Sequence, residues 1–205
     1  MLDKIKYLGH ASILIEDICG KIIYIDPWKI KNNSIKADII LVTHPHFDHF
    51  SEEDIKKISN DKTVLYSCRE VIEKTSLKNK YVIKPFEEVK MDLLIIKGFP
   101  SYNINKNFHP KENQYLGFII KCNNFSIYIA GDTDLIEEAK KLDVNLMILP
   151  IGGTYTMDFR EAAELVNTAK PSYVIPYHYG DIVGSEKDAI NFKSLVKKSE
   201  VIIKK

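Results

Sequence analysis

The chain has 205 residues, of which 45% are hydrophobic and 28% are charged, as in an ordinary soluble globular protein. Twenty-nine Lys and Arg residues against 28 Asp and Glu residues leave a net charge of +1, so no basic surface for nucleic acid or an anionic membrane is indicated. The sequence shows neither an apolar run long enough to span a bilayer nor a signal peptide's apolar region.

The three cysteines, Cys19, Cys68 and Cys122, are far apart in the sequence, and no Cys-x-x-Cys pair occurs. This odd number and wide spacing indicate neither a disulfide framework nor a cysteine zinc site. We therefore expect a reducing, cytoplasmic setting.

The first third of the chain predicts mainly strands. Residues 4–8 and 13–16 form a predicted β-hairpin around a turn at 9–11, and residues 21–25 form the next strand. Pro27 blocks further pairing, so Asp26 is expected at a strand tip. A buried strand is expected at 39–42, followed by a helix at 51–59. Ser51 is the predicted cap of this helix, with the acid Asp54 three positions later.

The rest of the chain alternates strands and helices. We expect strands at 63–66, 81–83, 89–98, 116–121, 125–130, 145–149, 173–175 and 201–203. We expect helices at 69–75, 135–142, 159–169 and 186–197. Residues 99–114 form a long polar loop that carries His109, and a loop of that length inside a compact domain is usually functional or mobile.

The histidines point to one site. All six of them, His10, His44, His46, His49, His109 and His178, fall in predicted loops or at predicted strand ends. The stretch 43–49, Thr-His-Pro-His-Phe-Asp-His, directly follows the buried strand at 39–42. Imidazole and carboxylate groups are ligands for zinc and, as second choices, for manganese or iron. Alternate positions can aim His44 and His46 at one ion and Asp48 and His49 at a neighbouring ion, whereas solvated loop histidines are the plain alternative.

The motif His-x-His-x-Asp-His after a strand resembles the signature of the metallo-β-lactamase superfamily. The resemblance covers nearly the whole chain and implies a four-layer αββα sandwich, in which helices flank two mixed β-sheets. Periodicity alone supports only an α/β or α+β fold, and without a composition break we expect a single domain over residues 1–205. The segments 150–157 and 176–181 look most similar to the branch that contains L-ascorbate-6-phosphate lactonase.

The resemblance also implies a set of metal ligands. His44, His46 and a later histidine would hold one ion, Asp48, His49 and His178 would hold a second, and Asp132 would bridge them. The family's usual position for the later histidine, after the strand at 89–98, has none here. Either His109 folds back to fill this position, or the first ion has only two histidines, Asp132 and water.

Other residues are candidates for supporting roles. The resemblance places His10 beside the metals, as a contact of a ligand or of the substrate, although a structural turn histidine is an equal reading. Asp26 resembles a strand-tip aspartate that orients a ligand. Pocket residues could include Thr154, Tyr155, Tyr177, Tyr179 and Lys111, for which packing or solvation explains the sequence equally well.

The implied activity is hydrolysis of an ester, lactone or phosphoester by a hydroxide that two divalent ions activate, zinc being the first choice. Asp48 and Asp132 would be the catalytic carboxylates. The alternatives are a phosphodiesterase for small molecules or lipids and an inactive metal-binding scaffold. A flavodiiron oxygen reductase is disfavoured by His46 and the short chain. We expect a small-molecule substrate and neither nucleic acid nor membrane as a partner, and leave self-association open.

Overall fold

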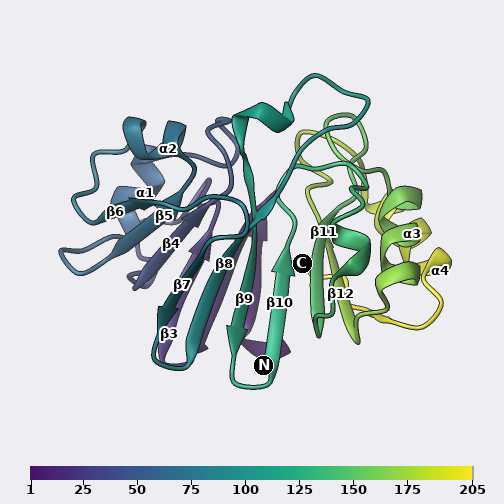
Figure 1. Ribbon diagram of the computed structural model, residues 1–205, viewed down its shortest axis with the longest axis horizontal. Coiled ribbons are helices and arrows are strands. Elements are labelled where there is room, and N and C mark those ends of the chain that lie inside the picture. The colour runs from purple at the N-terminus through teal and green to yellow at the C-terminus, as the bar shows by residue number, and fades with distance from the viewer. Residues whose placement is uncertain (205) are drawn as a thin grey trace.

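The computed structural model describes residues 1–204, which form two β-sheets packed face to face with helices outside them (Figure 1). The first sheet has six strands in sequence order, β1 (Ile5–Gly9), β2 (Ser12–Ile18), β3 (Lys21–Ile25), β4 (Ile39–Val42), β5 (Val64–Ser67) and β6 (Lys80–Val82). The pairs from β1 to β3 are antiparallel and those from β3 to β6 are parallel.

The second sheet has seven strands, ordered from β13 down to β7. They are β7 (Glu88–Met91), β8 (Leu94–Pro100), β9 (Leu116–Cys122), β10 (Phe125–Ile129), β11 (Leu146–Pro150), β12 (Tyr173–Tyr177) and β13 (Glu200–Val201). Strands β7 to β10 pair antiparallel and β10 to β13 pair parallel. Both sheets are therefore mixed, as the family resemblance implied.

Helices cover the outer faces of the sandwich. The helices α1 (Glu52–Ile58) and α2 (Arg69–Lys74) lie beside the first sheet, and α3 (Phe159–Ala169) and α4 (Glu186–Leu195) lie beside the second (Figure 1). Ser51 caps α1 by accepting a hydrogen bond from the Asp54 amide. The four-layer αββα architecture is thus confirmed. Within residues 1–204, no helix is long and apolar enough to cross a membrane.

The core has two parts, one between the sheets and one between the second sheet and its helices. Strand β9 serves both, since Phe118 and Ile120 pack in the first part and Ile119 packs in the second. This alternation follows from the two-residue period of a strand. Strand β4 is buried along its whole length, so the histidine motif begins at a rigid, fully packed support.

Two predicted elements were wrong. The expected strand at 89–98 is a hairpin of β7 and β8, because Asp92 adopts a left-handed φ of 50° and reverses the chain. The expected helix at 135–142 is only a short 3-10 turn, η3 (Ala139–Lys141). Two further 3-10 turns are η1 (Leu2–Lys4) and η2 (Lys111–Asn113), the latter inside the loop predicted at 99–114.

The prediction that the cysteines form no disulfide was also wrong. Cys19 and Cys122 are joined by a disulfide bond, with a Cα–Cα distance of 5.9 Å, although 103 positions separate them in the sequence. Cys19 lies in the turn between β2 and β3, and Cys122 ends β9, so the bond links the two sheets. Cys68 is buried and free. Sequence spacing could not show this proximity, because the two residues belong to different sheets.

Candidate metal centre

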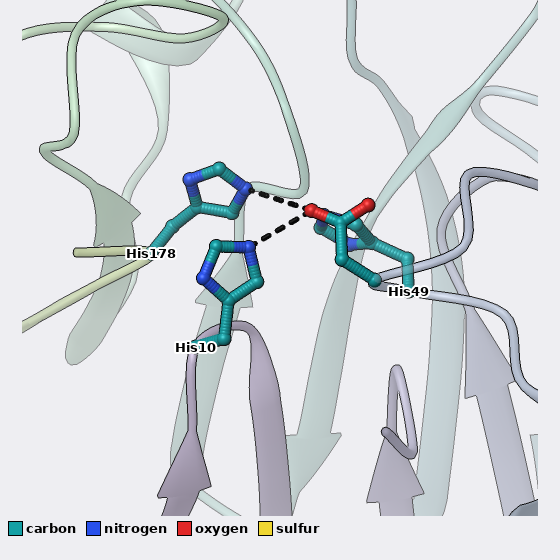
Figure 2. A group of neighbouring side chains, drawn as sticks. His10, His49 and His178 are labelled. Carbon is teal, nitrogen blue, oxygen red and sulfur yellow. Dashed lines mark hydrogen bonds and ion pairs between the residues drawn. The ribbon is translucent and has the colours of Figure 1, made fainter. Parts of the chain in front are cut away.

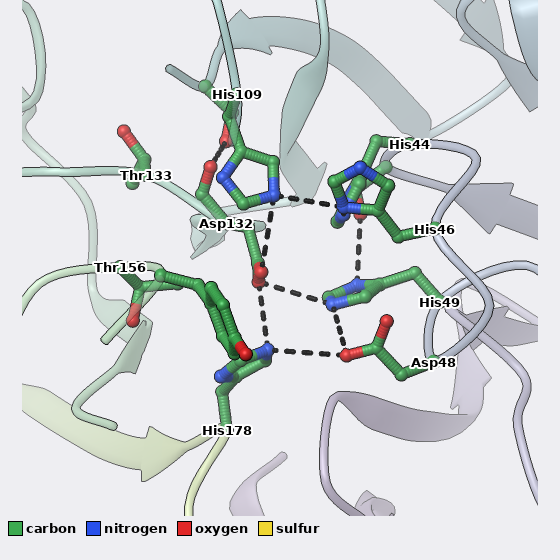
Figure 3. Close-up of polar contacts among 12 residues, drawn as sticks. His44, His46, Asp48, His49, His109, Asp132, Thr133, Thr156 and His178 are labelled. Carbon is green, nitrogen blue, oxygen red and sulfur yellow. Dashed lines mark hydrogen bonds and ion pairs between the residues drawn. The ribbon is translucent and has the colours of Figure 1, made fainter. Parts of the chain in front are cut away.

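The candidate residues all follow strand ends at one edge of the sandwich (Figure 3). His10, Asp26 and His178 come directly after β1, β3 and β12, and each has a left-handed φ, of 47°, 47° and 57°. This conformation costs a non-glycine residue roughly 1–2 kcal/mol, so the surrounding contacts must maintain it. Such strain at neighbouring positions is typical of functional sites.

Gly131 turns the chain after β10 and thereby places Asp132. Its φ is 65°, and a Cβ atom at this position would lie 2.6 Å from the backbone oxygen of Leu116. Both the conformation and the close approach require glycine. Glycine at position 131 is therefore a local requirement of the fold directly before Asp132.

One group of donor atoms gathers around His46. Its Nδ1 lies 3.0 Å from Nε2 of His44 and 3.2 Å from Nε2 of His109, and Nε2 of His109 lies 3.5 Å from Oδ2 of Asp132. His109 therefore folds back from its loop to the position beside His44 and His46. Of the two sequence-based alternatives, the geometry matches the one in which His109 joins this group.

A second group gathers around the other oxygen of Asp132. Oδ1 of Asp132 lies 3.2 Å from Nε2 of His49 and 3.2 Å from Nε2 of His178. These two nitrogens lie 3.7 Å and 3.8 Å from Oδ2 of Asp48. Asp132 thus presents one carboxylate oxygen to each group, the arrangement that a bridging ligand requires (Figure 3).

These donors fit a metal ion by two criteria. Nε2 of His49, Nε2 of His178 and Oδ1 of Asp132 are buried without a hydrogen-bond partner in the described part of the chain. Buried polar atoms normally have partners, so three such atoms side by side, two imidazole nitrogens and a carboxylate oxygen, fit coordination to a shared cation. Two ligands of a tetrahedral zinc ion lie about 3.3–3.4 Å apart, close to the separations within both groups.

Asp26 and Thr43 determine which nitrogens of His44 and His49 face the site. The Thr43 hydroxyl donates to Oδ2 of Asp26 at 2.7 Å and therefore accepts from Nδ1 of His44 at 2.9 Å. Nδ1 of His49 donates to the same Asp26 oxygen at 2.8 Å. In the neutral ring the proton then lies on Nδ1, so Nε2 keeps its lone pair for a metal ion; Nε2 of His44 faces His46 and Nε2 of His49 faces Asp132. The sequence suggested the role of Asp26 but gave no signal for Thr43.

The His10 ring lies beside that of His178 in the second group (Figure 2). Its Nε2 lies 2.9 Å from Oδ2 of Asp48, and its backbone oxygen accepts a hydrogen bond from the amide of His178 at 2.8 Å. Its ring centroid lies 4.1 Å from that of His178. His10 is buried and touches both residues, so it belongs to the site and is not an isolated turn histidine.

The electrostatics favour a cation. Burial by itself raises the pKa of Asp132, but His178 and His49 lower this pKa well below its ordinary value. Burial lowers the pKa of His44 and His46, and it lowers the pKa of His109 to about 4. At neutral pH, Asp132 is then ionised and these three imidazoles are neutral, which are the protonation states of metal ligands.

The pKa shifts in the second group also indicate an environment that favours a cation. Burial opposes protonation of His49 and His178, yet Asp132 raises the pKa of both, with Asp26 contributing at His49. Burial likewise opposes ionisation of Asp48, but the hydrogen bond from His10 lowers the pKa of this carboxyl. The carboxylates that attract protons to these nitrogens would equally attract a metal cation.

The other residues predicted to line a pocket have different surroundings and do not form one group around the donors. Tyr177 is buried, Thr154 is exposed, and Lys111 lies 3.5 Å from Glu138. Tyr179 lines a cavity of about 610 Å³ that opens beside His10. His10 is the one residue of the cluster that lines this cavity, so the cavity adjoins the donors without containing them.

Comparison with known proteins places this arrangement in a family. Residues 4–178 match the family described as Beta-lactamase superfamily domain. A protein of Thermococcus kodakarensis, named UPF0173 metal-dependent hydrolase, is 33% identical over 98% of this chain and 95% of its own length. A Pyrococcus horikoshii protein of the same description is also 33% identical, over 98% of this chain and 96% of its own. Igni18, a metallo hydrolase from Ignicoccus hospitalis, is 25% identical with a TM-score of 0.78, covering 97% of this chain and 93% of the other.

Proposed function

This chain belongs to the β-lactamase superfamily, and from that membership and the two donor groups we propose that it is a metal-dependent hydrolase with a dinuclear site. The single observation that carries this proposal is the position of Asp132, whose two oxygens each face one group of histidines. The relatives that match nearly the whole chain are named metal-dependent hydrolases.

The two ions would share Asp132 and would otherwise have separate ligands. His44, His46, His109 and Asp132 would hold the first, and Asp48, His49, His178 and Asp132 would hold the second. Neutral imidazoles and carboxylates suit zinc first, with manganese or iron(II) as alternatives. When bound, two such ions lower the pKa of a water molecule and polarise the bond to be cleaved.

The chain's own residues then handle the proton. Asp48 makes its described contacts through Oδ2, which faces His10, His49 and His178, and its side chain keeps some contact with solvent. The Oδ1 atom of Asp48 is therefore available to accept a proton from the attacking water and to pass it to the leaving group. Asp132 would hold the two halves of the site at a fixed separation, and His10 would keep Asp48 in place.

The reaction would be cleavage of an ester, lactone or phosphoester of a small molecule. A lactone substrate is suggested by the sequence similarity of segments 150–157 and 176–181 to the ascorbate-phosphate lactonase branch. The alternatives remain a phosphodiesterase for small molecules or lipids and a scaffold without activity. A small-molecule substrate and the absence of nucleic-acid or membrane partners stay predictions. The Cys19–Cys122 disulfide removes the ground on which a cytoplasmic location was expected.

The test is hydrolysis by protein loaded with zinc, manganese or iron(II), after removal of bound metal by a chelator. Para-nitrophenyl esters, a γ-lactone and bis-para-nitrophenyl phosphate represent the three substrate classes. We expect turnover of at least one class that disappears with the chelator and with Asp48→Asn. If the loaded protein binds two ions but cleaves none of the three kinds of substrate, the scaffold alternative is favoured.

A further inference from the structure

Two aromatic pairs flank the donor cluster, one beside each group of donors. Trp28 lies edge-on to His10, with ring centroids 5.4 Å apart, and packs against Phe47 at 6.0 Å. In the loop that carries His109, Phe108 packs against Tyr155 with ring centroids 4.7 Å apart. We call Trp28, Phe47, Phe108 and Tyr155 the rim. One member of each pair, Phe47 or Phe108, is adjacent in the sequence to a proposed ligand.

One aromatic residue of each pair is exposed, and it stands next to proposed ligands in the sequence. Phe47 stands between His46 and Asp48 in the sequence and is 68% exposed, and Phe108 precedes His109 and is 47% exposed. The Asn103 side chain accepts a hydrogen bond from the His109 amide and donates one to the backbone oxygen of Tyr155. The same contacts that place a ligand therefore hold the Phe108 pair beside it.

Exposed aromatic side chains gain free energy when they are covered by an apolar group. Single exposed apolar residues are common on protein surfaces, but paired aromatic residues on both sides of a buried polar site are typical of ligand recognition. Ile104, 56% exposed in the same loop as Phe108, adds to the apolar character of that side.

Two lysines close to rim residues, Lys29 and Lys106, are already paired with carboxylates. Lys29, which lies over the Trp28 ring, contacts Asp181 at 2.6 Å, and Lys106 contacts Asp134 at 2.5 Å. Recognition of an anionic group generally uses charge-assisted bonds from an available Lys or Arg. Lys29 and Lys106 instead pair with the protein's own carboxylates.

We propose that the rim binds the apolar arms of an uncharged substrate, so that the site cleaves a neutral carboxylic ester or lactone with aliphatic or aromatic substituents. This inference rests on the proposed hydrolase function and selects among its substrate classes. The donors would bind the scissile group, while the Trp28 and Phe108 pairs would cover the arms on either side of it.

The first experiment uses binding, because Trp28 is the single tryptophan of the chain and its fluorescence reports on the rim. Metal-loaded protein is titrated with neutral aliphatic ketones of increasing chain length and, separately, with dimethyl phosphate. We expect affinity to rise with chain length and the rise to be lost in Phe108→Ser. Two results would overturn the inference even if the protein is a hydrolase: equal affinity for all of the ketones, or binding of dimethyl phosphate that is tighter than binding of the ketones.

The second experiment measures kcat/KM for para-nitrophenyl acetate, butyrate and hexanoate. We expect a rise of at least about ten-fold from acetate to hexanoate, from partial burial of the added methylenes. Phe47→Ser and Phe108→Ser should flatten this rise at unchanged metal content. Leu93→Ser, which changes a 65% exposed residue in the turn between β7 and β8, is the matched control and should keep it. A flat profile in the wild type contradicts the rim, whereas chain-length-dependent ketone binding without any turnover contradicts the hydrolase function alone.

Discussion

Asn103 holds His109 by two hydrogen bonds to one atom. Oδ1 of Asn103 accepts from the backbone amide of His109 at 3.0 Å and from its Nδ1 at 3.0 Å. Because an amide oxygen can only accept, Nδ1 of His109 carries the proton and Nε2 presents its lone pair to His46 and Asp132. Asn103 is itself fixed by Asp134, to which its amide nitrogen donates at 3.1 Å.

Asn103→Ala should weaken the first metal site. The loss of a residue that orients a ligand typically costs about 10–100-fold in metal affinity, and Asn103→Ala should fall in this range. The affinity of each site can be measured by competition with a chromophoric chelator. Asn32→Ala, at an exposed position, is the control. Equal affinities in both variants would show that His109 needs no orienting partner.

The number of bound ions should follow the two donor groups. We expect two ions per wild-type chain, about one in His109→Ala and in His178→Ala, and reduced occupancy of both sites in Asp132→Ala. Elemental analysis of protein reconstituted with zinc measures this directly. Two ions retained in His109→Ala would make His109 a bystander, and loss of both ions in that variant would indicate that the two sites form only together.

The stability of the metal-free protein should decrease as the pH is lowered, and His109 should account for part of this decrease. Its pKa is about 4 in the folded protein, below the ordinary histidine value, so between these values the unfolded chain binds a proton that the folded chain does not. This residue therefore contributes stability that is present above the ordinary pKa and lost as pH falls toward 4. In denaturant titrations of chelator-treated protein, His109→Gln should show a shallower loss between about pH 6.5 and 4 than the wild type. An identical pH dependence would contradict the lowered pKa.

Reduction should destabilise the protein through Cys19 and Cys122. A cross-link between residues 103 positions apart restricts the unfolded chain, and such bonds typically contribute about 2–4 kcal/mol. Dithiothreitol should lower the midpoint of thermal unfolding in the wild type and in Cys68→Ser. The midpoint of the double variant Cys19→Ser with Cys122→Ser should not respond to it. A wild-type midpoint that is insensitive to reductant would show that the bond contributes nothing.

The sequence by itself predicted most of the elements and most of the candidate donors. The apolar run 39–42 ahead of His44 is a local pattern that specifies a strand. Asp158 with Glu161 three positions later is a local pattern that specifies the start of α3, and the structure has both as a capping box. The donors His44, His46, Asp48 and His49 were visible because they lie within six positions, and short-range spacing survives folding.

Only the tertiary structure decided how distant segments meet. It brought His109 to His46 across 63 positions, through Asn103 and Asp134, whose side chains give no distinctive sequence pattern. It also joined Cys19 to Cys122 and divided the predicted strand at 89–98 into a hairpin. The physical reason is the same in each case. Local periodicity records which face of an element is buried, whereas the pairing of loops from different sheets depends on where the packed core places their ends.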